Sequence, residues 1–309
     1  MKAMNNKTHI EGWIYNHTLE IKESGPNSKT PGTIYITGNL EVATDNALTN
    51  IVTVHFTYTT EKTSKGKPNN TFNVLKDIVE GRLYTITKDG AEKASMVSID
   101  TAIGLNEFYS DRNGQEELVS AKRNEGGFVS VVSSLKEDEN LRNTFDVDMV
   151  ITGAFTKEAD PEKNLPEKMI LKGGIFDFRK ALMPIELSVT LPGAISYFES
   201  MGISQTEPMF TRLQGQQISA VTTREVVEQG AFGAPIVKKY SSTRKDWVVT
   251  WAASEPYAWD DESSITAAEM KTAMEERATH LATLKARQDE YNASKNQAAP
   301  ATAPGAFNF

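Results

Sequence analysis

The stretch that decides the fold is IYITGNLEV at residues 34–42, in which the aliphatic side chains occupy even positions only. This alternation is typical of a β-strand with one buried face. Two further runs, His9–Tyr15 and Ile51–Tyr58, show the same alternation, and turn-forming residues separate the three runs. Next comes Phe72–Val79, whose apolar spacing of about 3.6 residues predicts a short helix that stops at Gly81.

Two more strands are expected after this helix, at Ala94–Phe108 and Phe128–Ser133, on either side of a charged hairpin tip at Asp111–Gly127. The same order of elements then recurs in the second half of the chain. Its members are strands at Phe145–Phe155, Met169–Phe178 and Pro184–Leu191, a helix at Ala194–Met201 that ends at Gly202, and strands around Gln217–Val227 and Trp247–Trp251. Gly38 aligns with Gly174 in this repeat, and a glycine inside a strand marks a bulge or a sharp bend.

Three strands, a short helix and two strands form the element order of the five-stranded OB barrel. With this order the sequence resembles the single-stranded-DNA-binding (SSB) proteins of bacteria and especially of phages. The resemblance is carried by IEGWI at residues 10–14, IYITGNLEV at 34–42 and VTVHF at 52–56, and it extends to the second half through the repeat. It implies a mainly β fold with two tandem OB-like five-stranded barrels. The alternative is another two-domain β sandwich or barrel.

The expected domains are a first OB-like barrel at residues 1–140, a second at 141–259, a C-terminal helix at 260–297 and a tail at 298–309. Thr266-Ala-Ala-Glu269 has the sequence of a capping box, which predicts the start of the helix. A heptad seam follows, formed by Met270, Met274, Arg277, Leu281, Leu284, Gln288 and Tyr291. This seam either packs on the barrels or joins two copies of the chain. The uncharged tail contains two prolines, and we expect it to be disordered.

The composition narrows the function classes. The chain of 309 residues has no cysteine, and its 33 Lys and Arg against 41 Asp and Glu give a formal charge of −8. The absence of cysteine excludes a disulfide framework, a thiolate metal site and a cysteine nucleophile. No apolar run approaches the roughly 18 residues that a membrane span needs. We expect a cytoplasmic protein, in the host cytoplasm if a phage encodes it, without a membrane partner.

Catalytic motifs are missing from the sequence. The four histidines form no His-x-x-x-His pair, and neither a phosphate-binding loop nor a G-x-S-x-G nucleophile elbow is present. We therefore expect no catalytic residue, no bound metal, no cofactor and no enzyme activity.

The candidate binding residues lie on the outer face of the first barrel. Strand parity places Trp13, Tyr15 and Tyr35 opposite the buried aliphatic positions, and it places His55 on the same outer face. The same parity places Tyr58 inside. Exposed rings on a sheet bind single strands, because every base offers a π face for stacking.

The loop after the third strand adds charge to this face, because it contains Lys62, Lys65 and Lys67 against one acidic residue, Glu61. Flexible lysines at the rim of an aromatic face neutralise phosphates, so the binding they support weakens with salt. The alternative is that the rings pack under the second barrel or the C-terminal helix and the lysines belong to an ordinary solvated loop.

The second repeat differs on the corresponding face. Its first strand directs Asp146, Asp148 and Val150 outward, and the two carboxylates would repel phosphates. The second barrel is therefore expected to be structural or protein-binding on this face. A weaker second candidate for nucleic-acid binding consists of Phe176, Phe178, Arg179 and Lys180.

The tail offers a candidate partner site, Phe307 and Phe309. Bacterial SSB proteins commonly end in a disordered linker and an acidic tip closing with Phe, which replication and repair proteins capture. This sequence keeps the terminal Phe but has no acidic residue in its last ten, so an inert end is the alternative.

Together these features predict a non-catalytic protein, phage or plasmid encoded, that binds single-stranded DNA without sequence preference in replication or recombination. A homo-oligomer could form through the C-terminal helix. The alternative is a structural or assembly protein, such as a virion or tail component, that uses the aromatic face as a protein interface.

Overall fold

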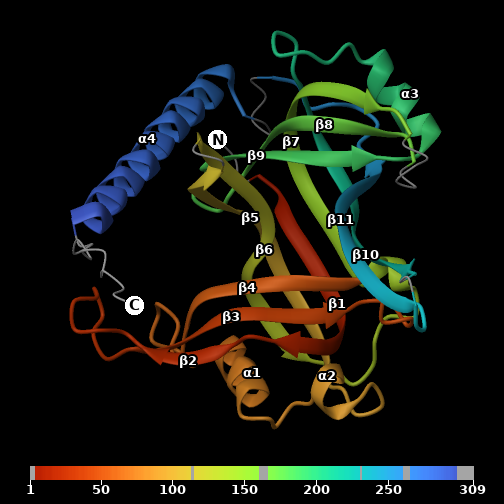
Figure 1. Ribbon diagram of the computed structural model, residues 1–309. Coiled ribbons are helices and arrows are strands. Elements are labelled where there is room, and N and C mark those ends of the chain that lie inside the picture. The colour runs from red at the N-terminus through yellow and green to blue at the C-terminus, as the bar shows by residue number, and fades with distance from the viewer. Residues whose placement is uncertain (1–3, 113–114, 160–165, 230–231, 260–264, 298–309) are drawn as a thin grey trace, which may run out of the picture.

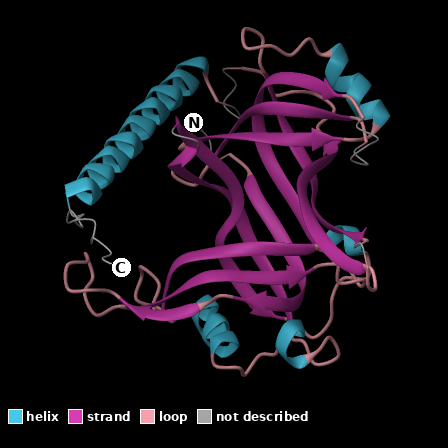
Figure 2. Cartoon of the chain, viewed as in Figure 1, coloured by secondary structure: helices cyan, strands magenta, loops and turns pink. Residues whose placement is uncertain are grey.

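The computed structural model describes residues 4–112, 115–159, 166–229, 232–259 and 265–297. Within these residues, eleven strands join in one continuous sheet that curls into two barrels, and the long helix α4 (Ala267–Gln297) lies beside them (Figure 1). Strands dominate the fold, and the shorter helices lie at its periphery (Figure 2). The predicted tail at 298–309 lies outside the described residues.

The first barrel closes through five strands, β1 (Asn6–His17), β3 (Ile34–Ala43), β4 (Ile51–Thr60), β5 (Met96–Arg112) and β6 (Gln115–Val131). β1 pairs with β3, β3 pairs with β4, and β4 runs parallel to β6. β6 pairs with β5, which returns to β1. The short strand β2 (Glu20–Glu23) extends the sheet beyond β3. The helices α1 (Asn70–Val79) and α2 (Ile86–Asp89) follow the third strand of the circuit, as in an OB barrel.

The second barrel repeats this circuit with β7 (Asn143–Lys157), β8 (Lys168–Phe176), β9 (Leu182–Val189), β10 (Met209–Glu228) and β11 (Ile236–Ala252). β7 pairs with β8 and β8 with β9, while β9 runs parallel to β11. β11 pairs with β10, which returns to β7. The helix α3 (Pro192–Ser200) again follows the third strand. The predicted fold class, a mainly β protein with two OB-like barrels and a C-terminal helix, is confirmed.

Each barrel encloses its own apolar core. In the first, Ile36, Leu40 and Val42 of β3 are fully buried and pack with β1, β4 and α1, whereas Ile34, expected on the same face, is 47% exposed at the start of the strand. Asn69 caps α1 by accepting a hydrogen bond from the Thr71 amide, and Phe72 and Leu75 then enter the core. Burying each such side chain contributes about 1.5–3 kcal/mol. Periodicity therefore predicted β1, β3, β4 and α1 of this barrel close to their observed positions.

The two barrels are joined along β1. The first half of this strand pairs with β7, so that Asn6 stands opposite Val147. The side-chain amide of Asn6 donates to the backbone oxygens of Ile103, at 3.0 Å, and Phe176, at 3.2 Å, which connects both barrels. Between the barrels the chain forms the short 3₁₀ helix η1 (Glu139–Leu141). The residue boundaries of the domains stay a prediction, since one sheet runs through both barrels.

Each barrel extends one long hairpin to the other barrel. The β5–β6 hairpin of the first barrel inserts Ile103 into the core of the second barrel. The β10–β11 hairpin of the second barrel reaches back to the first, where Gln217 and Asn124 exchange two side-chain hydrogen bonds of 2.8 and 2.9 Å. The predicted hairpin tip at Asp111–Gly127 is wrong, because β6 already begins at Gln115. Both faces of this hairpin carry polar side chains, so its sequence lacks the alternation that identifies a half-buried strand.

Helix α4 begins at the predicted capping box. The Thr266 amide donates to Glu269 at 3.0 Å, and the Glu269 amide donates to the Thr266 hydroxyl at 3.2 Å. Met270 of the predicted seam packs with its neighbour Ala273 against the outer layer of the second barrel, whereas the seam residues Met274 and Tyr291 are 57% and 60% exposed. The first half of the helix therefore packs on the barrels, as one of the two interpretations of the seam predicted. Self-association stays a prediction. No helix among the described residues is long and apolar enough to cross a membrane.

Candidate nucleic-acid interface

A bulge in β4 places two tyrosines together on the outer face of the first barrel. Gly38 of β3 pairs with Phe56 of β4, and the residue two before Gly38 pairs with the residue three after Phe56. Two residues of β4, Thr57 and Tyr58, therefore stand opposite the single residue Thr37 of β3, which is a β-bulge. The extra residue reverses the alternation, so Tyr58 is 47% exposed. The prediction that Tyr58 points into the barrel is therefore wrong.

The two tyrosine rings form a pair. The ring centroids of Tyr35 and Tyr58 lie 4.5 Å apart, with 35° between the ring planes. The Tyr58 hydroxyl shares hydrogen bonds of 3.0 Å with the hydroxyls of Ser24 and Thr30, which connect the β2–β3 loop to β4. The same bonds lower the pKa of Tyr58 from its ordinary value. The pair is thus held in position by its neighbours while part of each ring faces outward.

The predicted lysine loop leaves β4 beside this pair. Residues 61–69 form a tight turn in which Lys62 and Pro68 make a β-bridge and the Thr63 amide donates to the Lys67 oxygen at 2.8 Å. Asn69 closes the turn by donating from its side chain to the Thr60 oxygen at 2.9 Å.

The position of this turn follows from the strand register, since Thr60 stands opposite Tyr35. Lys62, Lys65 and Lys67 are all exposed, and none of them forms an ion pair with another described residue. The structure therefore brings the three lysines to the tyrosines. We call Tyr35, Tyr58 and the turn at 61–69 the tyrosine end.

His55 lies further along the same outer face. It stands opposite Asn39, and its Nδ1 lies 2.7 Å from the Asn39 side-chain oxygen. Burial, followed by the charge of Arg123, lowers the pKa of His55 from its ordinary value. A histidine with a lowered pKa is mostly neutral at pH 7. Its imidazole is therefore suited to stacking or hydrogen bonding with a base more than to pairing with a phosphate.

Trp13 is separated from the tyrosine end. It stands opposite Ala43, eight residues from Tyr35 on β3, which corresponds to roughly 26 Å along the strand. The guanidinium carbon of Arg142 lies 5.6 Å from the centroid of the Trp13 ring, so this residue covers one face of the indole. Tyr15 occupies a bulge of β1 and is half-buried. The predicted group of three aromatics is therefore split between the two ends of the sheet.

The outer face of β7 is covered by the chain itself. Arg212 pairs with Asp146, while Asp148 accepts hydrogen bonds from the Asn5 amide at 2.7 Å and the Tyr257 hydroxyl at 3.1 Å. Burial raises the pKa of Asp148 from its ordinary value. Val150 is 1% exposed. These side chains lie on the outer face of the barrel as predicted, but the segments before β1 and after β11 cover Asp148 and Val150 in a second buried layer.

The residues of the second predicted nucleic-acid site do not lie together on one exposed face. Phe176 is buried in this second layer, whereas Phe178 is 89% exposed and lies 5.0 Å from the Arg179 guanidinium carbon. Phe307 and Phe309 lie outside the described residues. Within the described residues, no group of three or more acidic or histidine side chains gathers as a metal site would require.

Comparison with known proteins identifies the family of this chain. The protein-family model described as YorF matches residues 5–287, which include both barrels and most of α4. Among solved structures, a deletion mutant of the single-stranded DNA binding protein from Thermus aquaticus is similar at a TM-score of 0.45 and 9% sequence identity, over 85% of this chain and 100% of that chain. No curated protein matches the sequence.

Proposed function

For this chain, which belongs to the YorF family, we propose that the outer face of the first barrel binds single-stranded DNA without sequence preference and without catalysis. The observation that carries the proposal is the tyrosine end. There the Tyr35–Tyr58 pair lies beside three exposed lysines at the end of an OB-like sheet. Stacking surfaces and mobile cations are the two elements that single-strand binding requires.

The proposed mechanism assigns separate roles to the two kinds of side chain. The tyrosine rings stack on bases, and each stack contributes about 1–3 kcal/mol without reading the base edge. The ammonium groups of Lys62, Lys65 and Lys67 contact phosphates and release counterions. Further along the face, the imidazole of His55 can receive another base. Trp13 has a lesser part, because Arg142 covers one face of its ring.

We assign this binding to replication or recombination, since both processes expose single strands of any sequence. The proposal includes no chemical step, in line with the missing catalytic motifs. Recruitment of replication proteins through Phe307 and Phe309 stays a prediction. So does assembly through α4.

The test is the affinity for oligo(dT) of the double variant Tyr35→Ala/Tyr58→Ala. We expect it to lose about 2–6 kcal/mol of binding free energy, because two stacking surfaces disappear. Tyr84→Ala is the matched control, since Tyr84 is also 47% exposed but lies beyond α1. Tyr58→Phe should bind like the wild type, because it keeps the ring.

Circular dichroism must show that each variant is folded. Equal affinities of the double variant and the Tyr84→Ala control would refute the stacking role. If the wild type does not bind oligo(dT) but co-purifies with virion or tail particles, the aromatic pair belongs to a protein interface instead.

A further inference from the structure

The tyrosine end is not the only part of the outer face that can hold a ligand. Between the two barrels lies a cavity of about 500 Å³, which we call the inter-barrel cleft. Its lining includes Thr53 and His55 of β4, Arg123 of β6, and Ser219 and Lys245 of the β10–β11 hairpin. This volume falls within the range of roughly 300–1,000 Å³ that is typical of small-ligand sites.

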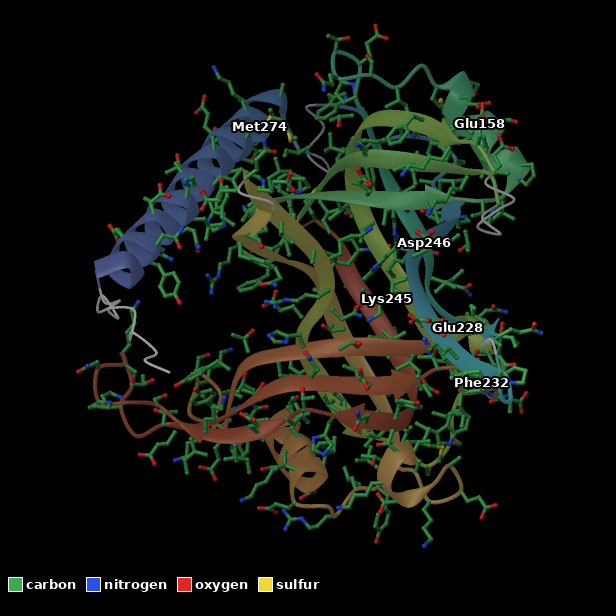
Figure 3. All side chains as sticks on the ribbon, viewed as in Figure 1. Glu158, Glu228, Phe232, Lys245, Asp246 and Met274 are labelled. Atoms are coloured by element: carbon green, nitrogen blue, oxygen red, sulfur yellow. The ribbon has the colours of Figure 1, made fainter. Side chains whose placement is uncertain are left out.

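Cationic side chains enter the cleft from both barrels. Lys122 and Arg123 come from β6, where Arg123 pairs with Glu125 at 2.8 Å. Lys245 comes from β11, and Figure 3 labels it between the barrels. Lys245 is exposed, and its ammonium group lies 3.4 Å from the neutral Thr53 hydroxyl. The carboxylate of Asp246 also lines the cleft, but it accepts hydrogen bonds of 2.5 Å from Lys168 and Ser188. Glu41 is the other acidic lining residue.

Two polar atoms of cleft residues lack a partner. The hydroxyl of Ser219 and the Nε atom of Arg123 are buried, and neither forms a hydrogen bond within the part of the chain that is described. Buried polar atoms in folded proteins are almost always hydrogen-bonded. Arg123 belongs to β6 of the first barrel and Ser219 to β10 of the second, so a polar ligand between the barrels is one source of the missing partners.

An aromatic ring completes the lining. Trp247 is 7% exposed, and the Lys122 ammonium lies 5.9 Å from the ring centroid. Lys122 also donates to the backbone oxygen of Glu186 on β9, so it lies where the two barrels meet. Trp247 also belongs to the core of the second barrel, where its ring packs on Phe145, so it offers little surface for stacking. The cations and the unsatisfied hydroxyl match the chemistry of the phosphate and sugar of a nucleotide.

The cleft also continues from the tyrosine end. Along the outer face of β3, Tyr35 is followed by Asn39, which stands opposite His55, and then by Glu41, which stands opposite Thr53. Thr53 contacts Lys245 in the cleft. We propose that the inter-barrel cleft binds a nucleotide of the same single strand, so that the β10–β11 hairpin of the second barrel closes over DNA held by the first. This inference rests on the proposed function, and it gives the second barrel a direct part in binding.

A single introduced cysteine tests this path, because the chain contains none of its own. Ile218→Cys places a thiol in the cleft, at a residue that is 41% exposed. Val227→Cys is the matched control on the same strand, 57% exposed and outside the cleft lining. Saturating oligo(dT) should slow the reaction of the Ile218→Cys thiol with a maleimide severalfold and leave the control thiol unaffected.

A salt titration gives the second measurement. Lys245→Ala should reduce the slope of log K against log salt by about 0.7, the value for one phosphate contact in a single strand. Lys239→Ala is its control, because Lys239 is exposed on the same strand and pairs with Glu225. Protection of the cleft thiol together with the reduced slope supports the inference.

The two proposals can fail separately. Equal thiol reactivity with and without DNA, in a protein whose binding still depends on Tyr35 and Tyr58, would overturn the cleft proposal alone. A wild-type chain that does not bind oligo(dT) at any salt concentration would overturn both proposals.

Discussion

At the scale of single residues, the direction of Tyr58 depends on the bulge opposite Thr37, which is next to Gly38 in β3. Gly38 has a φ of +126°, and a Cβ atom there would lie 2.3 Å from the backbone oxygen of Thr18. Only glycine combines this conformation with so close an approach. The period-two pattern of β4 contains no sign of the extra residue, but the glycine inside β3 was the one available signal of a bulge.

Replacing this glycine should therefore be costly. We expect Gly38→Ala to lower the free energy of unfolding by about 1–3 kcal/mol, because the side chain meets backbone at a positive φ. Gly153→Ala is the control, since a Cβ at this glycine of β7 would have no neighbour within 4 Å. Urea denaturation measures both variants. Equal stability of the two would show that the approach at Thr18 is not a constraint.

Lys122 supplies a residue-scale prediction about pH. Burial, partly opposed by Asp246 and Glu186 and assisted by Lys168, lowers the pKa of Lys122 from 10.5 to about 8. Between these two values the unfolded chain holds a proton that the folded chain has released, so stability rises with pH. Below about pH 8 Lys122 is protonated in both the folded and the unfolded chain, so the folded state carries the full free-energy cost of burying the charged ammonium group.

The comparison with Lys122→Met isolates this effect from the other titrating groups. Relative to the variant, the wild type should gain stability as the pH rises from about 8 towards 10.5. Urea denaturation at several pH values measures the difference. A constant difference over this interval would contradict the buried position of the ammonium group.

At the scale of elements, two ion pairs attach α4 to the β5–β6 hairpin, the exposed pair of Lys285 with Glu116 and the buried pair of Arg277 with Glu107. An exposed pair contributes little, so the buried one matters more. Arg277 donates from Nη1 to Glu107 at 3.0 Å, and the side chains of the pair are 13% and 6% exposed. Burial alone would raise the pKa of Glu107, but the hydrogen bonds and charge of Arg277 outweigh it and lower this pKa. Removing one member of a buried pair costs about 3–5 kcal/mol, because the other charge stays unpaired.

We therefore expect Arg277→Met to release α4 from the β5–β6 hairpin. Limited trypsin digestion should then cleave after Lys285 and Arg287 faster than in the wild type, while the barrels stay intact. Glu276→Gln, next to it on the exposed surface, is the control. Unchanged cleavage in Arg277→Met would mean that the apolar packing around Ala273 and the Lys285–Glu116 pair hold the helix without Arg277.

The elements differ in how far the sequence could predict them. Strands whose apolar residues alternate, such as β3 and β7, and the helix α1 follow from apolar periodicity and caps, and they lie close to their predicted positions. The outer parts of the two hairpins could not be predicted in this way, since they bury little apolar surface on either face. Strand β2 was missed for the same reason, because all four of its residues are exposed.

At the scale of the whole molecule, the site depends on contacts that a linear pattern does not contain. The position of the lysine turn beside Tyr35 could be predicted, because an antiparallel meander places the end of β4 next to the start of β3. The separation of Trp13 from Tyr35 arises from the register of β1 on β3, and its cover by Arg142 comes from the segment between the barrels. The inter-barrel cleft arises from the way the second barrel packs on the first. The net charge of −8 similarly conceals a local group of cations at the tyrosine end.

The most direct measurement of single-strand binding is the affinity of the wild-type chain for oligo(dT) over a range of salt concentrations. We expect binding at low salt, with log K falling linearly against log salt at a slope of about −2 or steeper, because three lysines at about 0.7 each contact phosphates. The triple variant Lys62→Ala/Lys65→Ala/Lys67→Ala should lose about two units of that slope. No binding at low salt, or an affinity independent of salt, would contradict single-strand binding by this face.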